Sequence, residues 1–315
     1  EVVRSAAESR EAFRRSLSVS SETKNAVRWD MAQSLRQHAG ALLRANRKDL
    51  AQARKNGMGK AFIDRLTLNP KRIEEMAVSL EEISRLPDPV GEVISSRRRP
   101  NGLWIHKVRA AIGVVAIIYE SRPNVTSDCV GLCFKSGNAV ILRGGSEALH
   151  SNTAIYEALL EVLEAHGIPQ GMVNLITVSD RKAVDHLLKL DDYIDVVIPR
   201  GGESLIRKVV QASRIPVIKH YKGICHVYVD EWADLNMATD ICYNAKVQRP
   251  GVCNAMECML VHRDIAVRFL PGMARKFREA GVELRGCPMT CLIVKDARRV
   301  TEKDYRTEYN DLMLS

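Results

Sequence analysis

The chain has 315 residues, a net charge of +9 and only 5% aromatic residues. This length is sufficient for two domains, in whose cores aliphatic side chains must do most of the packing. No stretch approaches the roughly 20 apolar residues that cross a bilayer, so we expect no membrane span. Basic residues are spread along the chain, and the one compact run, 97–99, precedes Pro-Asn-Gly and predicts a solvated loop. We therefore expect no nucleic-acid binding, whereas a basic surface suits small anionic ligands.

The eight cysteines contain no Cys-x-x-Cys pair, and no early apolar run resembles a signal peptide. This usage is typical of reduced thiols and predicts a cytoplasmic protein. Cys129 and Cys133 stand one helical turn apart, and Cys287 and Cys291 have the same spacing. Neither pair has the usual zinc spacing or a set of partner histidines, so we expect no metal site.

Residues 1–85 carry the periodicity of helices, with apolar residues three or four apart among polar ones. Ser20 or Ser21 is a plausible N-cap for the second of these helices, and residues 56–59 mark a break. A further helix is predicted from about Lys71 to Leu86, where Pro87 ends it. We interpret this region as a helical layer that covers a sheet.

A short hairpin or loop is predicted for 91–108, followed by a strand within 110–119 that is apolar throughout and therefore covered on both faces. Helical segments separate it from the later apolar runs, and this alternation is typical of a parallel sheet. The later strands are predicted at 139–142, 173–178, 194–198 and 215–218.

A glycine turn at 142–146 leads from a strand into a helix predicted over about 147–166. Free N–H groups and the helix dipole favour an anion at such a point. The turn at 199–204 repeats this arrangement. Neither turn has the Gly-x-Gly-x-x-Gly fingerprint, so each can equally be a plain connection or a helix cap.

We place the change of domain between His220 and Asp234 and divide the chain into 1–225 and 226–315. Apolar runs in the second part predict another α/β domain. Its strands are expected at 225–230, 256–262 and 291–294.

Cys253 lies in the second domain, within the segment 244–257, and is our candidate nucleophile. A thiol attacks a carbonyl only as the thiolate, so it needs an accessible site and a lowered pKa. Pro250-Gly251 allows a substrate to approach the main chain, and Lys246 and Arg249 place positive charge nearby. By these residues alone Cys253 can equally be a small buried hydrophobe.

The wider sequence resembles the aldehyde dehydrogenase superfamily, in the branch of the gamma-glutamyl phosphate reductases. The resemblance implies an α/β fold: a Rossmann-type parallel-sheet cofactor domain and a second, C-terminally incomplete α/β domain that carries the nucleophilic cysteine. Four motifs carry it in the expected order, namely residues 119–126, 135–148, 220–230 and 248–257.

The resemblance implies NADPH-dependent reduction of L-glutamate 5-phosphate to L-glutamate 5-semialdehyde, with release of phosphate, in proline biosynthesis. Cys253 is expected to form a thioester, and the Asn124 amide with the Cys253 N–H to form an oxyanion hole. Asn124 can also be an ordinary turn residue after Pro123. The resemblance also places His220 where aldehyde-oxidising relatives carry a water-activating Glu, which favours phosphate over water as the acyl acceptor in the reverse direction. His220 can equally be a packed residue at the domain junction.

The same resemblance implies an NADP(H) site. A cation at Arg143 beside the adenosine ribose suits NADP better than NAD. Glu308 resembles a residue that contacts the nicotinamide ribose, although it can equally be a solvated Glu. The remaining cofactor candidates are Gly144, Ser146 and Glu147 in the first glycine turn and Gly201 and Gly202 in the second.

Substrate phosphate and carboxylate need cations, and Arg122 and Arg249 adjoin the two catalytic motifs. Either can instead pair with a nearby carboxylate, Glu120 or Glu257. The sequence ends where family members continue with more of the catalytic domain and an oligomerisation arm, so we expect a homo-oligomer if that arm is present. The alternative is a truncated, non-catalytic member that acts as a binding or interaction protein.

Overall fold

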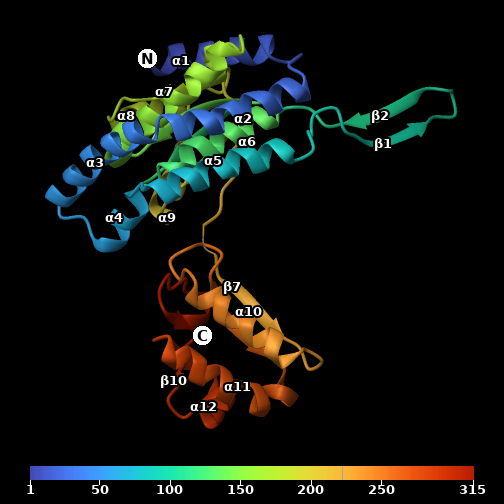
Figure 1. Ribbon diagram of the computed structural model, residues 1–315. Coiled ribbons are helices and arrows are strands. Elements are labelled where there is room, and N and C mark those ends of the chain that lie inside the picture. The colour runs from blue at the N-terminus through green and yellow to red at the C-terminus, as the bar shows by residue number, and fades with distance from the viewer. Residues whose placement is uncertain (222) are drawn as a thin grey trace. The chain divides into compact units, whose positions relative to one another are not determined.

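The computed structural model describes residues 1–221 and 223–315, which form two compact units, 1–219 and 220–315 (Figure 1). The boundary lies a little before the predicted division after residue 225. Strand β7 begins at Cys225, so that residue already belongs to the sheet of the second unit. None of the described helices combines the length and apolarity needed to cross a membrane.

The first unit begins with helices, as predicted. Ser20 is the N-cap of the second helix, and its hydroxyl accepts a hydrogen bond from the Thr23 N–H at 3.1 Å. Asn69 caps the fifth helix in the same way, with Pro70 as the first helical residue. The helices are α1 (Val2–Arg15), α2 (Ser21–Gln37), α3 (Ala39–Lys55), α4 (Lys60–Leu66) and α5 (Pro70–Arg85).

Four parallel strands follow, in the order β5-β4-β3-β6. Every residue of β3 is buried, which explains its unbroken apolar sequence. The strands are β3 (Val114–Tyr119), β4 (Ala139–Gly144), β5 (Val173–Leu175) and β6 (Val196–Arg200). The connecting helices are α6 (Asn124–Lys135), α7 (Leu149–Ala165) after the short η1 (Ser146–Ala148), α8 (Arg181–Leu187) after η2 (Gln170–Met172), and α9 (Glu203–Ala212) after β6.

The helices of the first unit form two layers. Helices α1 and α6 pack directly on the strands, whereas α2, α3 and α5 pack on α6 and α7 (Figure 1). Buried aliphatic side chains from all these elements form one continuous core. The predicted helical layer over a parallel sheet is therefore confirmed.

The predicted strand at 215–218 is wrong, because the segment makes only a single bridge, between Val217 and Val197. Pro216 accepts a hydrogen bond from the Val197 N–H at 2.9 Å but has no N–H to donate in return, so the ladder stops there. The strand predicted at 173–178 is shorter than expected and ends at Leu175.

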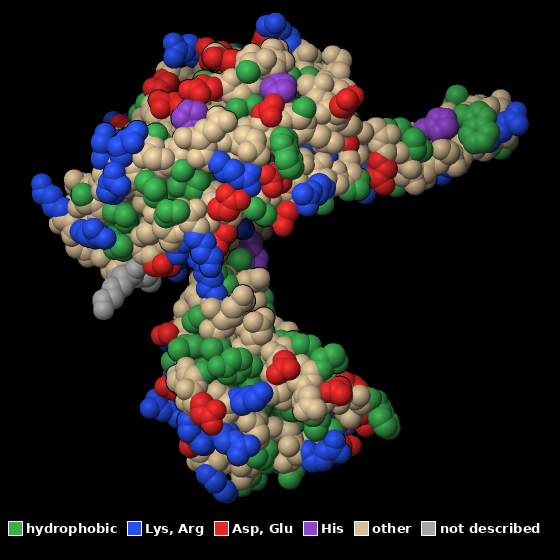
Figure 2. All heavy atoms as spheres, viewed as in Figure 1, with side chains coloured by type: hydrophobic (Ala, Val, Ile, Leu, Met, Phe, Trp, Pro, Cys, Tyr) green, Lys and Arg blue, Asp and Glu red, His purple; other side chains and the backbone are tan. Residues whose placement is uncertain are grey.

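An antiparallel hairpin of β1 (Val93–Arg98) and β2 (Trp104–Val108) extends from the first unit (Figures 1 and 2). All residues of both strands are exposed, including the apolar Ile94 and Trp104. The hairpin is confirmed, but the basic run at 97–99 is not confined to a loop. Two of its three residues end β1, because the Pro-Asn-Gly turn begins only after Arg99.

The second unit is also α/β, with parallel strands only among its described pairings. Strand β7 pairs with β8, and β9 lies between β10 and β11. Ser315 exchanges backbone hydrogen bonds with Glu257 and Met259 of β8, which joins β11 to β8. The elements are β7 (Cys225–Val229), α10 (Leu235–Val247), β8 (Met256–Val261), α11 (Arg263–Glu279), β9 (Glu283–Gly286), α12 (Pro288–Ile293), β10 (Arg298–Arg299), η3 (Asp304–Arg306) and β11 (Met313–Leu314).

The predicted strand at 291–294 is wrong, because most of this run belongs to helix α12. Pro288 occupies the first helical turn, and the Cys291 N–H donates to the Cys287 carbonyl at 3.0 Å. A short apolar run does not by itself distinguish a buried strand from a buried helix. The strands predicted from 225 and 256 are confirmed as β7 and β8.

Candidate active site

The motifs at 119–126 and 135–148 and the glycine turn at 199–204 meet at one edge of the parallel sheet in the first unit. Tyr119, the last residue of β3, is in register with Gly144 on β4 and with Arg200 on β6. Both glycine turns therefore begin at the carboxyl edge of the sheet, on either side of the segment after β3. The chain order reverses between β3 and β6, and ligands of open α/β sheets bind outside the carboxyl ends of strands at such a point.

Two carboxylates tie these segments together. The Glu120 Oε2 accepts a hydrogen bond from the Gly202 N–H at 2.9 Å. The Glu147 Oε1 accepts from both the N–H and the hydroxyl of Ser121, each at 2.9 Å. Ser121 has a φ of +46°, which is uncommon for a non-glycine residue, and these two bonds hold it there. The segment after β3 is thus fixed to both glycine turns.

The turn before α9 presents backbone N–H groups at the start of a helix. Gly202 is the N-cap of α9, no side chain caps this helix, and both Gly201 and Gly202 are exposed. The first N–H groups of a helix have no partner within it and favour an anion. Glu120 already places a carboxylate oxygen on the Gly202 N–H. The backbone N–H groups of this turn therefore bind an anionic oxygen, and the Glu120 carboxylate occupies that position here.

In the other turn, Arg143 is half-buried at the end of β4, and its guanidinium donates to the carbonyls of Gly144 and Ser179 at 2.9 and 3.1 Å. Ser146 and Glu147 lie in the short helix η1, so the main helix begins two residues later than predicted. A Cβ on Gly144 would meet the Asn152 side chain at 2.1 Å. This position therefore requires glycine for packing, whether or not a ligand binds nearby.

Asn124, the predicted oxyanion donor, is exposed at the first position of α6. Its side-chain amide donates to the Asp128 Oδ2 at 3.0 Å, and the Ser79 hydroxyl donates to the other Asp128 oxygen at 3.3 Å. Burial raises the pKa of Asp128, and the hydrogen bonds from Asn124 and Ser79 oppose that rise. Asp128 was not among the predicted site residues, although its four-residue spacing from Asn124 on a helix was a signal for this contact.

Cys253 lies in the turn between α10 and β8 and is the one exposed cysteine among the eight, all of which are free thiols. Its surroundings include two groups that the sequence did not point to. The Cys225 thiol donates to the Cys253 carbonyl at 3.3 Å. A Cβ on Gly223 would lie 2.4 Å from that carbonyl oxygen and 3.2 Å from the His220 Nε2, so glycine permits a close backbone approach here. Of the motif at 220–230, residue 222 lies outside the described part.

The structure corrects one part of the prediction that positive charge surrounds Cys253. Lys246 is completely buried, and its Nζ lies 3.0 Å from the Glu257 Oε2, which is also completely buried. Its charge is therefore balanced and does not favour a thiolate in the way we expected. Glu257 pairs with Lys246 rather than with Arg249, which is exposed. Arg122 is half-buried in the loop between β3 and α6.

Glu308 is half-buried between η3 and β11, in the same neighbourhood as Cys253. Burial raises the pKa of the Cys225 thiol, and the nearby charges of Cys253, Glu308 and Glu257 raise it further. Cys225 thus contacts the segment of the candidate nucleophile and lies within electrostatic reach of Glu308. The segment after η3 is anchored by Asp304, which accepts from the Tyr309 hydroxyl at 3.1 Å and from Arg285.

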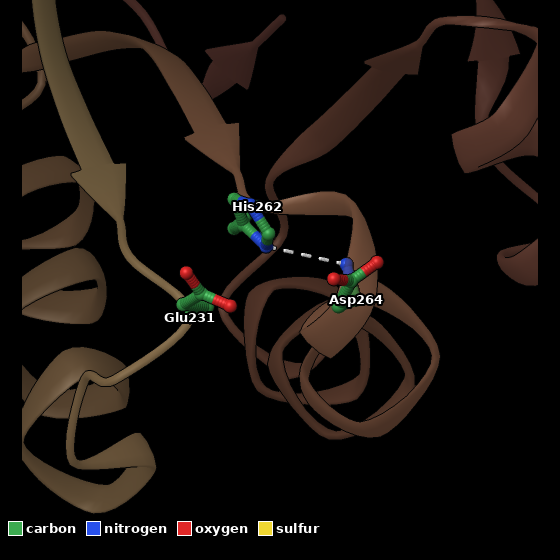
Figure 3. Close-up of side chains that lie close together, drawn as sticks. All are labelled: Glu231, His262 and Asp264. Atoms are coloured by element: carbon green, nitrogen blue, oxygen red, sulfur yellow. Dashed lines mark hydrogen bonds between the residues drawn. The ribbon is translucent and has the colours of Figure 1, made fainter.

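Glu231, His262 and Asp264 form the one group, within the described ranges 1–221 and 223–315, whose ligand atoms could converge on a metal ion (Figure 3). Glu231 follows β7, whereas the other two residues begin α11. The His262 Nδ1 accepts a hydrogen bond from the Asp264 backbone N–H at 3.4 Å, the dashed line in Figure 3. Both carboxylates are exposed, and the group is a surface cluster without a further feature that marks a ligand.

Comparison with known proteins decides the family. The model of the aldehyde dehydrogenase family matches residues 3–306. The chain belongs to the aldehyde dehydrogenase family. Within it, the chain is 52% identical over 314 residues to gamma-glutamyl phosphate reductase of Thermodesulfovibrio yellowstonii, covering 100% of this chain and 75% of that protein. It is 51% identical to the enzyme of the same name from Carboxydothermus hydrogenoformans, covering 100% of this chain and 76% of the relative.

Solved structures agree with this assignment. The gamma-glutamyl phosphate reductase of Thermotoga maritima superposes with a TM-score of 0.91 at 45% identity, covering 100% of this chain and 76% of that structure. A betaine aldehyde dehydrogenase of Staphylococcus aureus, solved in complex with NAD+, has a TM-score of 0.61 at 17% identity over 90% of this chain and 54% of its own, a likeness of fold alone. The predicted family, branch and fold class are confirmed, and the chain spans about three-quarters of the length of these reductases.

Proposed function

We propose that this chain reduces L-glutamate 5-phosphate to L-glutamate 5-semialdehyde with NADPH, releasing phosphate through a thioester on Cys253. The observation that carries the proposal is the exposed thiol in the turn between α10 and β8, in a chain that is 52% identical to a gamma-glutamyl phosphate reductase. Membership of this branch confirms the predicted oxidoreductase function in proline biosynthesis. The finer proposals are the cofactor preference and the roles of individual residues.

Members of the aldehyde dehydrogenase family use a nicotinamide cofactor. We propose that the first unit holds it, with the phosphates at the N–H groups of Gly201, Gly202 and the first turn of α9. Glu120 must then release the Gly202 N–H, which its exposed position allows. At the other turn, the carboxylate of Glu147 and the hydroxyl of Ser146 suit ribose hydroxyls, with Gly144 beside them. Arg143 there suits a 2′-phosphate, which favours NADPH.

The chemistry begins at Cys253. Its thiolate attacks the acyl carbon, a C–S bond forms, and the bond from that carbon to the phosphate oxygen breaks as phosphate leaves. NADPH, when bound, supplies the hydride that converts the thioester into a thiohemiacetal anion. That anion collapses, the C–S bond breaks, and aldehyde and thiolate are released. Negative charge develops on the former carbonyl oxygen in both steps, and we propose the Asn124 amide and the Cys253 N–H as its donors.

The remaining site proposals concern charge. Arg122 and Arg249 are proposed to bind the substrate phosphate and carboxylate. Glu308 is proposed to contact the nicotinamide ribose. His220 is proposed to stand in place of the water-activating Glu of aldehyde-oxidising relatives without activating water, so that phosphate is the acyl acceptor in the reverse direction.

Three coarser proposals accompany the reaction. The first unit is proposed as the cofactor domain and the second as the catalytic domain. We propose a cytoplasmic location from the eight free thiols. A homo-oligomer is proposed if the C-terminal arm is present, and the apolar side chains that the β1–β2 hairpin exposes, Trp104 among them, support this proposal.

The test is the reverse reaction, NADP-dependent oxidation of glutamate 5-semialdehyde in excess phosphate, followed at the nicotinamide absorbance. The native chain is compared with Cys253→Ala and with Cys287→Ala as the matched control. Cys287 suits this purpose because hydrogen bonds from Thr290 and Met289 outweigh its burial and lower the pKa of its thiol.

We expect phosphate-dependent turnover that Cys253→Ala abolishes and Cys287→Ala preserves. Turnover that survives in Cys253→Ala would overturn the proposed mechanism. A native chain that binds NADPH without turnover would instead favour the non-catalytic binding protein, which the close reductase relatives do not support at present.

A further inference from the structure

The segment that carries Cys253 is held at both ends by one buried ion pair. We call residues 248–255, between α10 and β8, the nucleophile loop. Lys246 lies on α10 just before this loop, and Glu257 lies on β8 just after it. The Lys246 Nζ and the Glu257 Oε2 are 3.0 Å apart, and both side chains have 0% exposure. The two ends of the loop are therefore joined by a direct, charged hydrogen bond.

Glu257 also holds a third segment. Its second carboxylate oxygen, Oε1, accepts a hydrogen bond from the Asn310 N–H at 3.0 Å. Asn310 has a φ of +54°, a left-handed conformation that few residues other than glycine tolerate as well as Asn does. In addition, the Glu257 backbone carbonyl accepts from the N–H and the hydroxyl of Ser315, each at 3.1 Å. Each oxygen of this carboxylate thus has a donor from a different part of the chain.

Stability alone gives little reason for such an arrangement. Burying two charges costs free energy that their attraction only partly returns, and apolar side chains of similar volume often fill such a position equally well. Apolar contacts, however, have no preferred direction, whereas hydrogen bonds to a carboxylate do. A carboxylate with one donor on each oxygen fixes the relative placement of the groups that bind it, here α10, β8 and the segment around Asn310.

The groups placed in this way are those that the proposed reaction uses. The nucleophile loop carries Cys253, and Glu308 stands two residues before Asn310. The Cys225 thiol donates to the Cys253 carbonyl at 3.3 Å, and its pKa is raised by burial and by the nearby charges of Cys253, Glu308 and Glu257. Catalytic geometry is sensitive to small displacements, and a misplacement of about 1 Å can lower a rate roughly 10²-fold.

We infer that Lys246 and Glu257 are positioning residues that fix the nucleophile loop against the segment of Glu308 and hold Cys253 in its reactive placement. The inference rests on the proposed function, in which Cys253 is the nucleophile and Glu308 contacts the cofactor. Neither Lys246 nor Glu257 touches substrate, because both are completely buried.

The experiment uses two single variants, Glu257→Gln and Glu257→Leu. They are compared with a double variant that combines Lys246→Met and Glu257→Met. Gln keeps an oxygen that can accept from the Asn310 N–H, whereas Leu removes both hydrogen bonds. The double variant removes both charges together and is expected to recover most of the thermal stability that Glu257→Leu loses. It does not restore the acceptor for Asn310. Asp296→Asn is the control, because it breaks an exposed pair with Arg278, 2.6 Å apart, in the same unit.

Two readouts are used below the unfolding temperature of every variant. The first is kcat and KM for glutamate 5-semialdehyde. The second is the rate of alkylation of Cys253 by iodoacetamide, quantified by mass spectrometry with Cys287 as internal reference. We expect the double variant to be stable, yet to show kcat and Cys253 alkylation lowered about 10- to 100-fold, with KM changed less than about threefold. Glu257→Gln should lie between it and the native chain, and Asp296→Asn should match the native chain.

A stable double variant with native kcat and native Cys253 alkylation would overturn the inference and leave the pair a structural feature only. The alkylation rate can be measured without turnover. It therefore tests the positioning role even if the proposed function is wrong. If the native chain does not turn over glutamate 5-semialdehyde, the proposed function fails, while a reduced Cys253 alkylation rate in the double variant still supports the positioning role.

Discussion

The two units hold their candidate residues by opposite means. At the sheet edge of the first unit the glycine turn before α9 is exposed, and the carboxylate that binds it, Glu120, is exposed as well. In the second unit the loop of Cys253 is held by Lys246 and Glu257, which are completely buried. A ligand can displace the first contact with little loss, whereas the second can be broken only by leaving a charge in the protein interior. The first arrangement suits exchange of a cofactor, and the second suits a fixed nucleophile.

The sharpest test of this contrast is Cys253→Ala. We expect turnover to fall on the order of 10⁴–10⁶-fold, as for other nucleophiles whose loss leaves binding intact. Affinity for NADPH, measured by fluorescence titration, should stay within about twofold. A variant that loses both turnover and NADPH binding would show that the two units do not separate chemistry from cofactor binding.

The buried pair is expected to have the next largest effect, on stability. Lys246→Met leaves the Glu257 carboxylate buried without its cation and should destabilise the second unit by about 3–5 kcal/mol. Hydrogen exchange of peptides from α10 and β8 measures this locally. Lys276→Met is the matched control, because Lys276 forms an exposed pair with Asp240 at 3.7 Å on the neighbouring helices, and we expect a change below about 1 kcal/mol. Equal effects of the two substitutions would contradict the contrast.

Asn124→Ala tests the oxyanion donor that we propose in the first unit. We expect kcat to fall roughly 10²–10³-fold, or about 2.7–4 kcal/mol of transition-state stabilisation, with little change in KM. Asp128→Asn, which leaves the Asn124 amide in place but alters its partner, should have a smaller effect in the same steady-state assay. An Asn124→Ala variant in which only KM changes would exclude the oxyanion role.

A smaller effect is expected for Arg143→Ala. Loss of a charged hydrogen bond to a 2′-phosphate, about 1.5–3 kcal/mol, should raise KM for NADPH roughly 10- to 100-fold and leave KM for NADH nearly unchanged. The ratio of the two KM values is the measurement. A proportional rise in both would mean that Arg143 supports the fold of the turn rather than the choice of cofactor.

The smallest expected effect concerns pH and Asp304. Hydrogen bonds from the Thr301 hydroxyl and N–H, followed by that from Arg285, lower the pKa of this carboxyl in the folded chain. A carboxyl with a depressed folded pKa adds stability above its unfolded pKa of about 3.9 and loses it as the pH falls further. Hydrogen exchange of 298–315 should therefore distinguish Asp304→Asn from the native chain at about pH 6, and less so near pH 3. A difference that persists unchanged at low pH would contradict this account.

Local sequence determined much of the fold. The Ser20 cap, the apolar run of β3 and the two strand–glycine–helix turns are features of neighbouring residues, and the structure contains each of them. Such signals survive folding because capping, backbone freedom and burial of a strand depend on only a few consecutive residues. The resemblance of the motifs to the reductases, and hence the function of the family, was also present in the sequence.

Local reasoning was wrong where the partner lay elsewhere in the chain. The run at 291–294 became the end of α12, and the strand expected at 215–218 was stopped at Pro216. In both cases the apolar run is only partly buried, since Val294 and Ile215 are buried whereas Leu292 and Ile218 are exposed. Their backbone conformation depended on a proline and on neighbours that a short apolar run does not specify.

Only the tertiary structure decided which charges meet. The sequence placed both Lys246 and Arg249 shortly before Cys253, yet folding buried one in an ion pair with Glu257 and left the other exposed. It likewise brought Glu120 to Gly202 across 82 positions and Asn310 to Glu257 across 53. Hydrogen bonds and ion pairs act over a few ångströms in space, so their partners are fixed by how strands and helices pack rather than by distance along the chain. The sequence identified the family and a candidate nucleophile, and packing decided which groups hold the segment that carries it.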